Sequence, residues 1–390
     1  MIFLMLVLVT LSFGLNLERA IETALEKNPQ LKALKEQRMA FEGMERSAMA
    51  FPNPEIRFES GFITNDKNGK PAGRAVYLLE YSQPVPLWDI RLKGKKVVEE
   101  EKTAFDHMIE SFRRKLVAEV YRNFYTALVK KETVRIWREN FKTASEVEDF
   151  VKRAYKLGEA TELELLRAKR EKDMAILQLR IAESLYQASL RDLERLLNVD
   201  VKDPEGDLSK IPSLKDIEPE KTPTVAFIKK RIEAVKRQIE LEKALAKPSL
   251  SAGFVVEDSE EGFYGLRVAL STRFPLFYRR QGEILQEIAR RESLSKELEG
   301  ELLNIKTKIS SIKIRLEILS KELEKLESKI IPRAEEELKL ALRSYRLRVI
   351  TLLELSDIRR RYYDLLLRRA ELYGMLHKVY SEFIEIGGWR

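Results

Sequence analysis

The sequence contains one stretch twice, and the two copies lie about 190 residues apart. Residues 155–170 align without a gap on residues 345–360, with Tyr, Thr, Glu, Arg and three Leu at matching positions. Other matches keep nearly the same offset: Pro86-Leu87-Trp88 with Pro275-Leu276-Phe277, and Pro29 and Pro54 with Pro223 and Pro248. A self-match at a fixed offset indicates one structural unit built twice. Any function should therefore come from pairing or closing these units.

The duplication predicts the domain organisation. We expect a first repeat at 15–198, a linker rich in Pro, Asp, Gly and Ser at 199–222, and a second repeat at 223–390. Residues 1–14 form an apolar run that is too short to span a bilayer comfortably, and it ends in small residues. We interpret this run as a signal peptide of an exported protein, with a short buried helix as the alternative.

The composition excludes several classes of function. The chain has 390 residues, 34% of them charged, a net charge of +8 and no cysteine. Lys and Arg are interleaved with Glu and form no basic block with aromatic residues, so nucleic-acid binding is not expected. Without cysteine there are no disulfides, no zinc–thiolate sites and no lipoprotein anchor. The chain carries no catalytic motif, and its two histidines lie in separate repeats. We therefore expect neither an enzyme nor a cofactor or metal site.

Most of each repeat is predicted to be helical. Helices are expected at 17–51 with a break at Asn28-Pro29, then at about 87–157, 161–197 and 224–246, followed by a long helix, a turn near 348 and a last helix that ends at 387–388. The long helix carries apolar residues in alternating steps of four and three, which predicts a supercoiled seam interrupted at Pro332. The seam residues are Ile305, Ile309, Ile312, Leu316, Leu319, Leu323, Leu326 and Ile330.

Four segments change to a period of two, which indicates strands with one apolar and one polar face. They lie at about 54–64, 74–83, 248–257 and 263–273. Four strands cannot close a barrel, but three copies would supply twelve. An even number of this size can close a membrane barrel with its apolar side facing lipid. The alternative is a pair of solvent-exposed hairpins that pack on the helices.

In their order and spacing, these segments resemble the TolC family of outer-membrane efflux proteins, in its drug and heavy-metal efflux branch. The resemblance covers nearly the whole mature chain. It rests on the helix at 17–31, the strand ends at 52–54 and 81–88, and the helix–turn–helix segments at 155–168 and 332–360. It implies a mainly α fold with a β-barrel contribution, in which a homotrimer joins a twelve-stranded outer-membrane barrel to a periplasmic helical tunnel.

The resemblance also implies a function. The protein would be the passive exit duct of a tripartite efflux or secretion system in the cell outer membrane, with most of the chain in the periplasm. A periplasmic adaptor protein and an inner-membrane pump would dock at the two helix–turn–helix tips, at Leu157, Gly158, Leu347 and Arg348. The family usually has Gly in both turns, so Arg348 is a departure. The alternative is a periplasmic coiled-coil scaffold or adaptor.

Finally, the resemblance implies that acidic residues close the periplasmic end. The matching positions are Glu354 and Asp357, which lie one helical turn apart on the same face. Three chains would form two stacked rings of three carboxylates. Such rings would favour cations, and mutual repulsion would raise the pKa of some carboxyl groups. On spacing alone, a solvated acidic flank is the alternative. The first repeat has Glu164 and Arg167 at these positions.

Overall fold

The computed structural model describes residues 15–65, 68–69, 71–258 and 264–389, so the predicted signal peptide lies outside the described residues. The chain divides into two compact units that each draw on both repeats. We call them the sheet unit, Ala33–Ile109 with Pro223–Leu303, and the helical unit, which comprises the chain up to Lys32, Glu110–Thr222 and the chain from Asn304 onwards. The long helices α3 (Ile90–Lys156) and α6 (Gln281–Lys325) contribute residues to both units.

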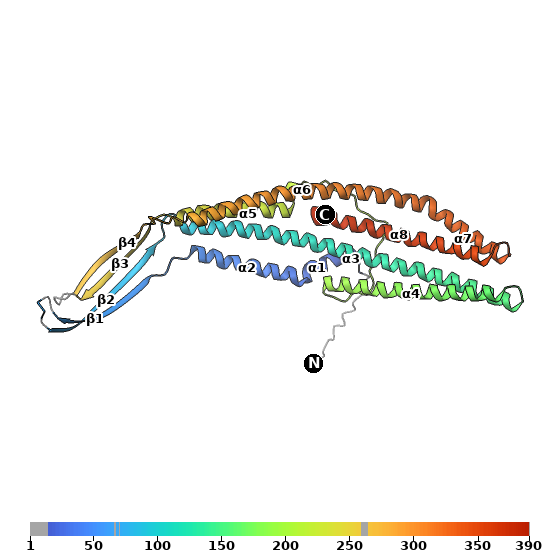
Figure 1. The fold of residues 1–390 in the computed structure, drawn as a ribbon, viewed down its shortest axis with the longest axis horizontal. Coiled ribbons are helices and arrows are strands. Elements are labelled where there is room, and N and C mark those ends of the chain that lie inside the picture. The colour runs from blue at the N-terminus through green and yellow to red at the C-terminus, as the bar shows by residue number, and fades with distance from the viewer. Residues whose placement is uncertain (1–14, 66–67, 70, 259–263, 390) are drawn as a thin grey trace, which may run out of the picture. The chain divides into compact units, whose positions relative to one another are not determined.

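The sheet unit contains a four-stranded antiparallel sheet with the order β1-β2-β3-β4 (Figure 1). The strands are β1 (Glu55–Asn65), β2 (Pro71–Val85), β3 (Ser249–Asp258) and β4 (Tyr264–Arg273), close to the predicted segments. Each repeat supplies one hairpin, and β2 pairs with β3 to join the hairpins into one sheet. This pairing between the repeats was not part of the sequence prediction.

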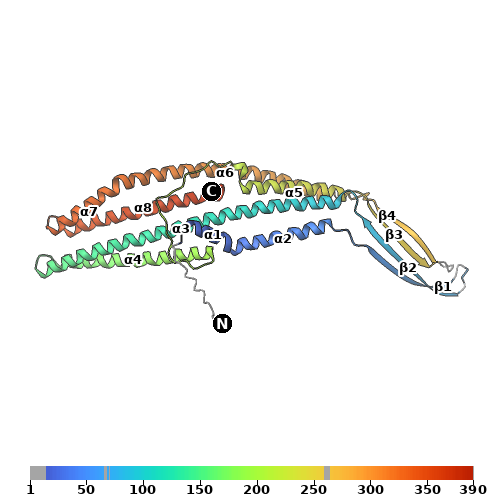
Figure 2. The ribbon, with the colours of Figure 1, turned by 180° about the vertical axis from the view of Figure 1, so that it is seen from behind.

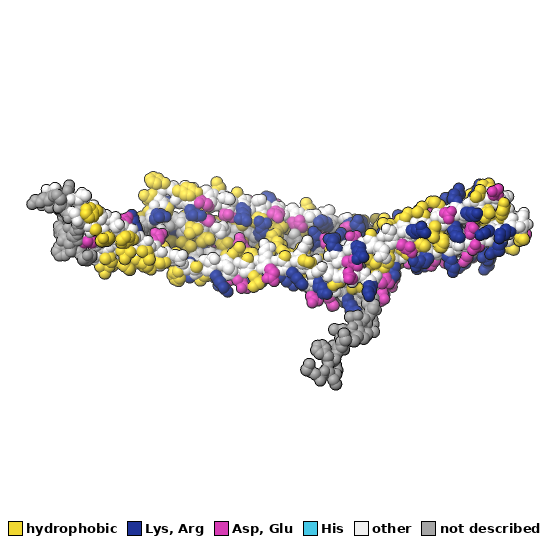
Figure 3. Space-filling view, turned by 90° about the horizontal axis from the view of Figure 1, so that it is seen from below, with side chains coloured by type: hydrophobic (Ala, Val, Ile, Leu, Met, Phe, Trp, Pro, Cys, Tyr) yellow, Lys and Arg dark blue, Asp and Glu magenta, His cyan; other side chains and the backbone are white. Residues whose placement is uncertain are grey.

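The register separates the side chains into two faces, as the alternating pattern predicted. One row across the four strands reads Ile56, Tyr81, Phe254 and Val268, and the next row reads Arg57, Glu80, Val255 and Arg267. Most of the large apolar side chains on the first face are exposed, and Figure 3 shows hydrophobic side chains gathered over the sheet. On the other face, Arg267 pairs with Glu257 and Arg57 with Glu59.

Gly253 lies on β3 where a side chain would collide with the neighbouring hairpin. A Cβ atom at this position would lie 1.8 Å from the carbonyl oxygen of Tyr81 on β2. Only a residue without a side chain allows the two strands to come this close. The helices α2 (Pro29–Met49) and α5 (Pro223–Leu245) complete this unit with the first part of α3 and α6, and Ile239 of α5 packs against Leu294 of α6.

The helical unit contains α1 (Leu17–Lys27), α4 (Glu162–Leu197), α7 (Ile331–Arg346), α8 (Leu352–Gly387) and the 3-10 turn Pro219–Lys221, together with most of α3 and the end of α6. Figures 1 and 2 show α3 beside α4 and α7 beside α8, each pair connected by a tight turn. The predicted break at Asn28 is present, because its side chain accepts a hydrogen bond from the backbone nitrogen of Leu31 and caps α2.

The seam of α6 ends in a π-helical turn, Leu326–Ile330, immediately before Pro332. Leu323 and Leu326 are buried as predicted, but Ile330 is exposed and Ile331 is buried in its place. The prediction for Ile330 was therefore wrong. A π turn inserts one residue into the helical repeat, so the apolar stripe continues one position later. The predicted interruption near Pro332 is confirmed.

A buried histidine of α8, His377, forms a hydrogen bond with the linker. His377 Nε2 donates to the carbonyl oxygen of Leu208 at 2.9 Å, so Nδ1 is the acceptor for the hydroxyl of Tyr121 at 2.8 Å. The ring stacks on Tyr125 with 3.5 Å between centroids. Burial lowers the pKa of His377 to about 4, and Asp207 offsets part of this effect.

Among the described residues, none of the helices is long and apolar enough to cross a membrane.

Candidate functional site

The first tip turn, between α3 and α4, is closed by Gly158. Its φ is +75°, in the left-handed region. The nitrogen of Gly158 donates to the carbonyl oxygen of Tyr155 at 3.0 Å, and the nitrogen of Glu159 donates to that of Ala154 at 2.8 Å. This crossed pair satisfies the last carbonyl groups of α3, as in a helix that ends on a left-handed glycine.

The second tip turn, between α7 and α8, has the same backbone shape although its left-handed residue is Arg348. Here φ is +60°. The nitrogen of Arg348 donates to the carbonyl oxygen of Tyr345 at 3.0 Å, and the nitrogen of Val349 donates to that of Ser344 at 2.9 Å. These bonds repeat those of the first turn with an offset of 190 positions. The departure from glycine therefore leaves the turn unchanged.

Each turn leads into a helix that begins with the same cap. In α8 the backbone nitrogen of Glu354 donates to Thr351 Oγ1 at 3.2 Å, and its carboxylate accepts from the backbone nitrogen of Thr351 at 2.7 Å. Thr161 and Glu164 form the same reciprocal cap at the start of α4. The Thr-x-x-Glu spacing is a known signal for this cap. The cap gives Glu354 a structural role that its acidic character alone did not predict.

The two helical hairpins, α3–α4 and α7–α8, share one core at their tips. Val151 and Ala154 of the first hairpin pack in the same buried cluster as Leu338, Tyr345 and Leu355 of the second. The hydroxyl of Tyr345 lies in this core without a hydrogen-bond partner. The apolar cluster thus holds the turns at Gly158 and Arg348 next to each other.

Polar contacts also join the two helical hairpins. The guanidinium of Arg348 lies 3.8 Å from Glu159 and 5.5 Å from the centroid of the Phe150 ring, so this side chain reaches from the second tip to the first. Deeper in the unit, the buried Arg359 of α8 donates to Glu171 of α4. These contacts could not be found from the sequence, because they join residues that lie 188 to 198 positions apart.

The tips expose apolar side chains on both turns. Leu157 and Leu347 occupy matching positions in the repeats and are each about three-quarters exposed. Leu163, Val349 and Leu353 add further exposed apolar surface close to the turns. We call these five residues the tip patch. Exposed apolar side chains gathered at the turns are candidates for contact with another protein.

The two acidic residues of the second tip already have partners within the chain. Within a single chain, hydrogen bonds from the backbone and hydroxyl of Thr351 lower the pKa of Glu354. Asp357 accepts from Arg360 at 2.6 Å and lies 2.8 Å from Arg361. Within one chain, the site is a capped helix start followed by an aspartate that is paired with two arginines.

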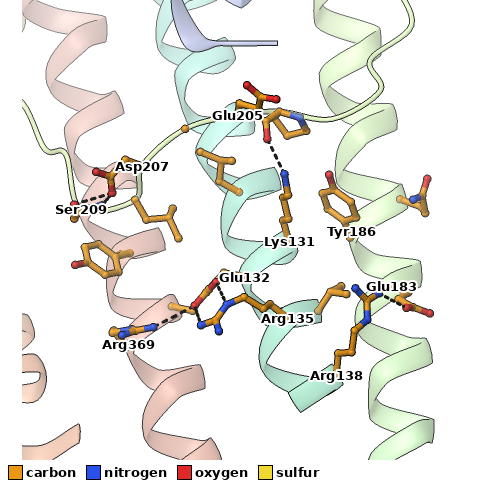
Figure 4. Close-up of a pocket in the computed structure, with 18 of the residues that line it drawn as sticks. Lys131, Glu132, Arg135, Arg138, Glu183, Tyr186, Glu205, Asp207, Ser209 and Arg369 are labelled. Atoms are coloured by element: carbon orange, nitrogen blue, oxygen red, sulfur yellow. Dashed lines mark hydrogen bonds and ion pairs between the residues drawn. The ribbon is translucent and has the colours of Figure 1, made fainter. Parts of the chain in front are cut away.

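A cleft of about 1170 Å³ in the helical unit was not anticipated by the sequence analysis (Figure 4). It lies among α3, α4, α8 and the linker near Glu205 and Asp207. Three ion pairs lie in or beside it: Arg138 with Glu183, Arg369 with Glu132, and Lys131 with Asp203. We interpret it as a solvated gap between the helices.

The described residues contain no cluster of His, Asp and Glu that could hold a metal ion.

Comparison with known proteins finds similarity to outer-membrane efflux proteins. Residues 20–199 match the family described as outer membrane efflux protein. The cobalt-zinc-cadmium resistance protein CzcC of Cupriavidus metallidurans is 19% identical over 383 residues, which cover 96% of this chain and 90% of that protein.

Solved structures share the fold. A membrane protein from Pseudomonas aeruginosa matches with a TM-score of 0.80 and 16% identity, over 95% of this chain and 92% of that one. The open state of the MtrE outer membrane channel of Neisseria gonorrhoeae matches with a TM-score of 0.74 and 18% identity, over 96% of this chain and 90% of that one. The fold is therefore that of outer-membrane efflux channels.

Proposed function

We propose that this chain, whose residues 20–199 match the outer membrane efflux protein family, is the outer-membrane exit duct of a tripartite efflux or secretion system. It conducts substrates passively from an inner-membrane pump and a periplasmic adaptor to the exterior. The sheet lies in the cell outer membrane, and most of the chain projects into the periplasm. The protein acts as a channel and not as an enzyme.

The observation that carries this proposal is the two-faced sheet. In water an exposed face with Phe58, Leu266 and Val268 would be a liability, and so would the two strand edges. Three copies would supply twelve strands, close every edge and turn this face to lipid. The homotrimer and its twelve-stranded barrel are part of the proposal, as is the division into repeats at 15–198 and 223–390 joined by 199–222.

We also propose that the adaptor and the pump dock at the tips, at Leu157, Gly158, Leu347 and Arg348. The tip patch supports this assignment, because it offers exposed apolar side chains at both turns. Glu354 and Asp357 are proposed to form the closed aperture and its cation-selective rings. The position of both residues on one face at the start of α8 supports this role.

The test of the membrane assignment is a pair of substitutions on neighbouring residues of β4. Leu266, 72% exposed, is on the apolar face, and Arg267 is on the opposite one. Leu266→Arg should destabilise membrane assembly by about 2–4 kcal/mol near the bilayer midplane. Arg267→Gln and a substitution at Ser251 should be tolerated. The measurement is the amount of trimer in outer-membrane fractions.

A soluble periplasmic parent protein, or equal tolerance of Leu266→Arg and Arg267→Gln, would contradict the proposal. The first of these outcomes would favour a periplasmic scaffold instead. Phe254→Arg is a weaker test of the same face, because Phe254 also stacks on Tyr81 with 5.3 Å between ring centroids.

A further inference from the structure

The segment after β4 exposes large apolar side chains where the sheet unit changes from strand to helix. Phe277 is 95% exposed, and Phe274, Leu276 and Tyr278 beside it are each more than half exposed. The corresponding segment after β2 exposes the ring of Trp88. Removing such apolar area from water is favourable, so this junction favours an apolar environment.

Basic side chains lie beside these apolar groups, and neutral groups hold them in place. Arg279 Nε donates to the carbonyl oxygen of Pro275 at 3.2 Å, and Lys93 Nζ donates to that of Trp88 at 2.7 Å. The ammonium group of Lys247 lies 4.7 Å from the centroid of the Trp88 ring. Carbonyl oxygens and aromatic rings attract a cation without cancelling its charge.

Two further contacts belong to the same junction. Trp88 Nε1 donates to the carbonyl oxygen of Pro248 at 2.8 Å, across 160 positions of sequence. The guanidinium of Arg91 lies 3.8 Å from the centroid of the Phe51 ring and donates to the carbonyl oxygen of Met49 at 2.8 Å. Segments from both repeats thus meet where the strands end and the helices begin.

The positive charge at this junction has no counter-charge within the described residues. We call its four basic residues the cation collar: Arg91, Lys93, Lys247 and Arg279. None of them forms an ion pair in the part of the chain that the structure describes. The acids Glu242 and Glu283 nearby both pair with Arg280 instead. A partner with negative charge would balance the collar.

The cation collar lies at the ends of strands that have the length needed to cross a membrane. The strands β3 and β4 have 10 residues each, and a transmembrane strand needs about 9–11. With the apolar face in lipid, the strand ends fall at the boundary between hydrocarbon and water. Aromatic side chains are enriched at this boundary, and Lys and Arg reach from it towards the headgroups. The junction therefore continues the lipid-facing surface to the level of the phosphates.

We propose that the junction binds the headgroups of anionic phospholipids, with the aromatic segment at the acyl boundary and the cation collar on the phosphates. This inference rests on the proposed function, because it requires the sheet to lie in the outer membrane. It names the lipid that the base of the sheet selects, in the leaflet on the periplasmic side.

The collar favours an anionic lipid over a zwitterionic one. A zwitterionic headgroup carries its own cation beside the phosphate, so a protein cation gains less from it. Arg279 uses one N–H group on Pro275 and keeps the others for the oxygens of a phosphate. The ammonium group of Lys247 contacts the ring of Trp88, which leaves its N–H donors available. The negative surface potential of an anionic leaflet adds to the attraction.

Trp88 is a reporter within the site, because it is exposed and contacts the collar, whereas Trp137 and Trp389 belong to the helical unit. The full-length protein is reconstituted into vesicles of brominated phosphatidylcholine, whose bromine atoms quench a neighbouring indole ring. Unbrominated phosphatidylglycerol, which is anionic, or unbrominated phosphatidylcholine then replaces a growing share of this lipid. Phosphatidylglycerol should restore the fluorescence at about a fivefold lower mole fraction, the ratio expected for one cation at an anionic surface.

Two variants assign this preference to the collar. Lys247→Gln combined with Arg279→Gln should at least halve the ratio, and the fold should persist because neither residue forms an ion pair within the described residues. Lys236→Gln removes one positive charge from α5 of the same unit, where Lys236 pairs with Glu233. This control should leave the ratio unchanged.

Equal displacement by both lipids, or no quenching of Trp88 in a protein that floats with the vesicles, would overturn the lipid site and leave the proposed function standing. A preference that survives in the double variant, or that Lys236→Gln lowers equally, would overturn the assignment to the collar. Inorganic phosphate at the same ionic strength should not compete, and competition would overturn the choice of a lipid. A parent protein that does not float with the vesicles would refute the membrane assignment as well.

A second measurement tests the aromatic segment. Phe277→Trp in the background of Trp88→Phe moves the reporter onto this segment, and brominated lipid should quench it. Leu303→Trp in the same background is the control, because Leu303 is 68% exposed but lies far along α6. Brominated lipid should not quench this variant. An indole at 277 that stays unquenched in vesicle-bound protein would mean that a protein surface covers the segment, and would overturn the lipid contact.

Discussion

At the scale of single residues, the two tips show that a turn can be kept while its most characteristic residue changes. A non-glycine residue in the left-handed region costs roughly 1–2 kcal/mol. Arg348 accepts this conformation at the position where the first repeat has Gly158. Its contacts with Glu159 and Phe150 offset part of the cost, and the reciprocal cap at Thr351 fixes the chain just beyond it.

We therefore predict that the shape of the tip turns, more than the identity of their residues, determines adaptor docking. Gly158→Val should leave the trimer intact and abolish efflux, because a β-branched residue resists φ > 0. A Cβ at Gly158 meets no atom within 4 Å, so the effect would come from the backbone and not from a clash. Gly158→Asn and Arg348→Gly, which tolerate this conformation, should retain efflux. Efflux assays with adaptor crosslinking check this, and normal docking by Gly158→Val would refute it.

His377 should make stability depend on pH. Its pKa is about 4 in the folded protein, where burial disfavours the charged form, against about 6.5 in the unfolded chain. The unfolded state therefore binds more protons between these values. The contribution is fully present above pH 6.5 and is lost as the pH falls towards 4, by on the order of 3 kcal/mol.

The measurement is the denaturant midpoint at pH 7 and pH 5 for the parent and for His377→Gln. The glutamine side chain can keep both a donor and an acceptor but does not titrate. The parent should lose more stability than the variant over this interval. Equal losses in the two proteins would show that His377 titrates normally.

At the scale of elements, the sequence predicted the helices and strands to within a few residues, because proline, glycine and periodicity signal them locally. It failed where the outcome depended on geometry between segments. The π turn before Pro332 shifted the buried position from Ile330 to Ile331. The pairing of β2 with β3 depends on Gly253, which reads in the sequence as one more small residue.

Gly253→Ala should separate the two hairpins. Its Cβ would lie 1.8 Å from a backbone oxygen that cannot move without breaking the strand pair. We expect a loss of more than about 3 kcal/mol, the size reserved for severe packing errors. Gly265→Ala on β4 is the control, because a Cβ there meets no atom within 4 Å. Folded yield and thermal stability of the two variants should differ clearly, and similar values would contradict this account of Gly253.

At the scale of the whole molecule, the proposed aperture places the acids of three chains on one axis. The tip turns and the spacing of Glu354 and Asp357 could be predicted from the sequence. The arginine partners of Asp357 and the tie from Arg348 to the first tip could not, because only the folded helices determine which side chains meet.

We predict cation-selective conductance in planar bilayers that trivalent cations block from the tip side. Glu354→Gln combined with Asp357→Asn should abolish the block. Glutamine can replace glutamate in the helix cap, so the trimer should persist. In the Glu164→Gln variant, the matched change in the first repeat, trivalent cations should block the channel as they do in the parent. If trivalent cations also block the double variant normally, the two residues are a solvated flank and the constriction lies elsewhere.

The joining of the two hairpins through β2 and β3 also sets an order of events during synthesis. Trp88 and Pro248 are 160 positions apart, so the first hairpin emerges long before the strand that pairs with it. Contacts this distant in the chain form slowly, because the entropy cost of closing a large loop comes before the contacts stabilise the fold. Until then the first β-hairpin, β1–β2, remains in the periplasm with its aromatic face unpaired. The exposed rings of Phe58 and Phe62 therefore make this hairpin the part of the chain that is most prone to aggregate during that interval.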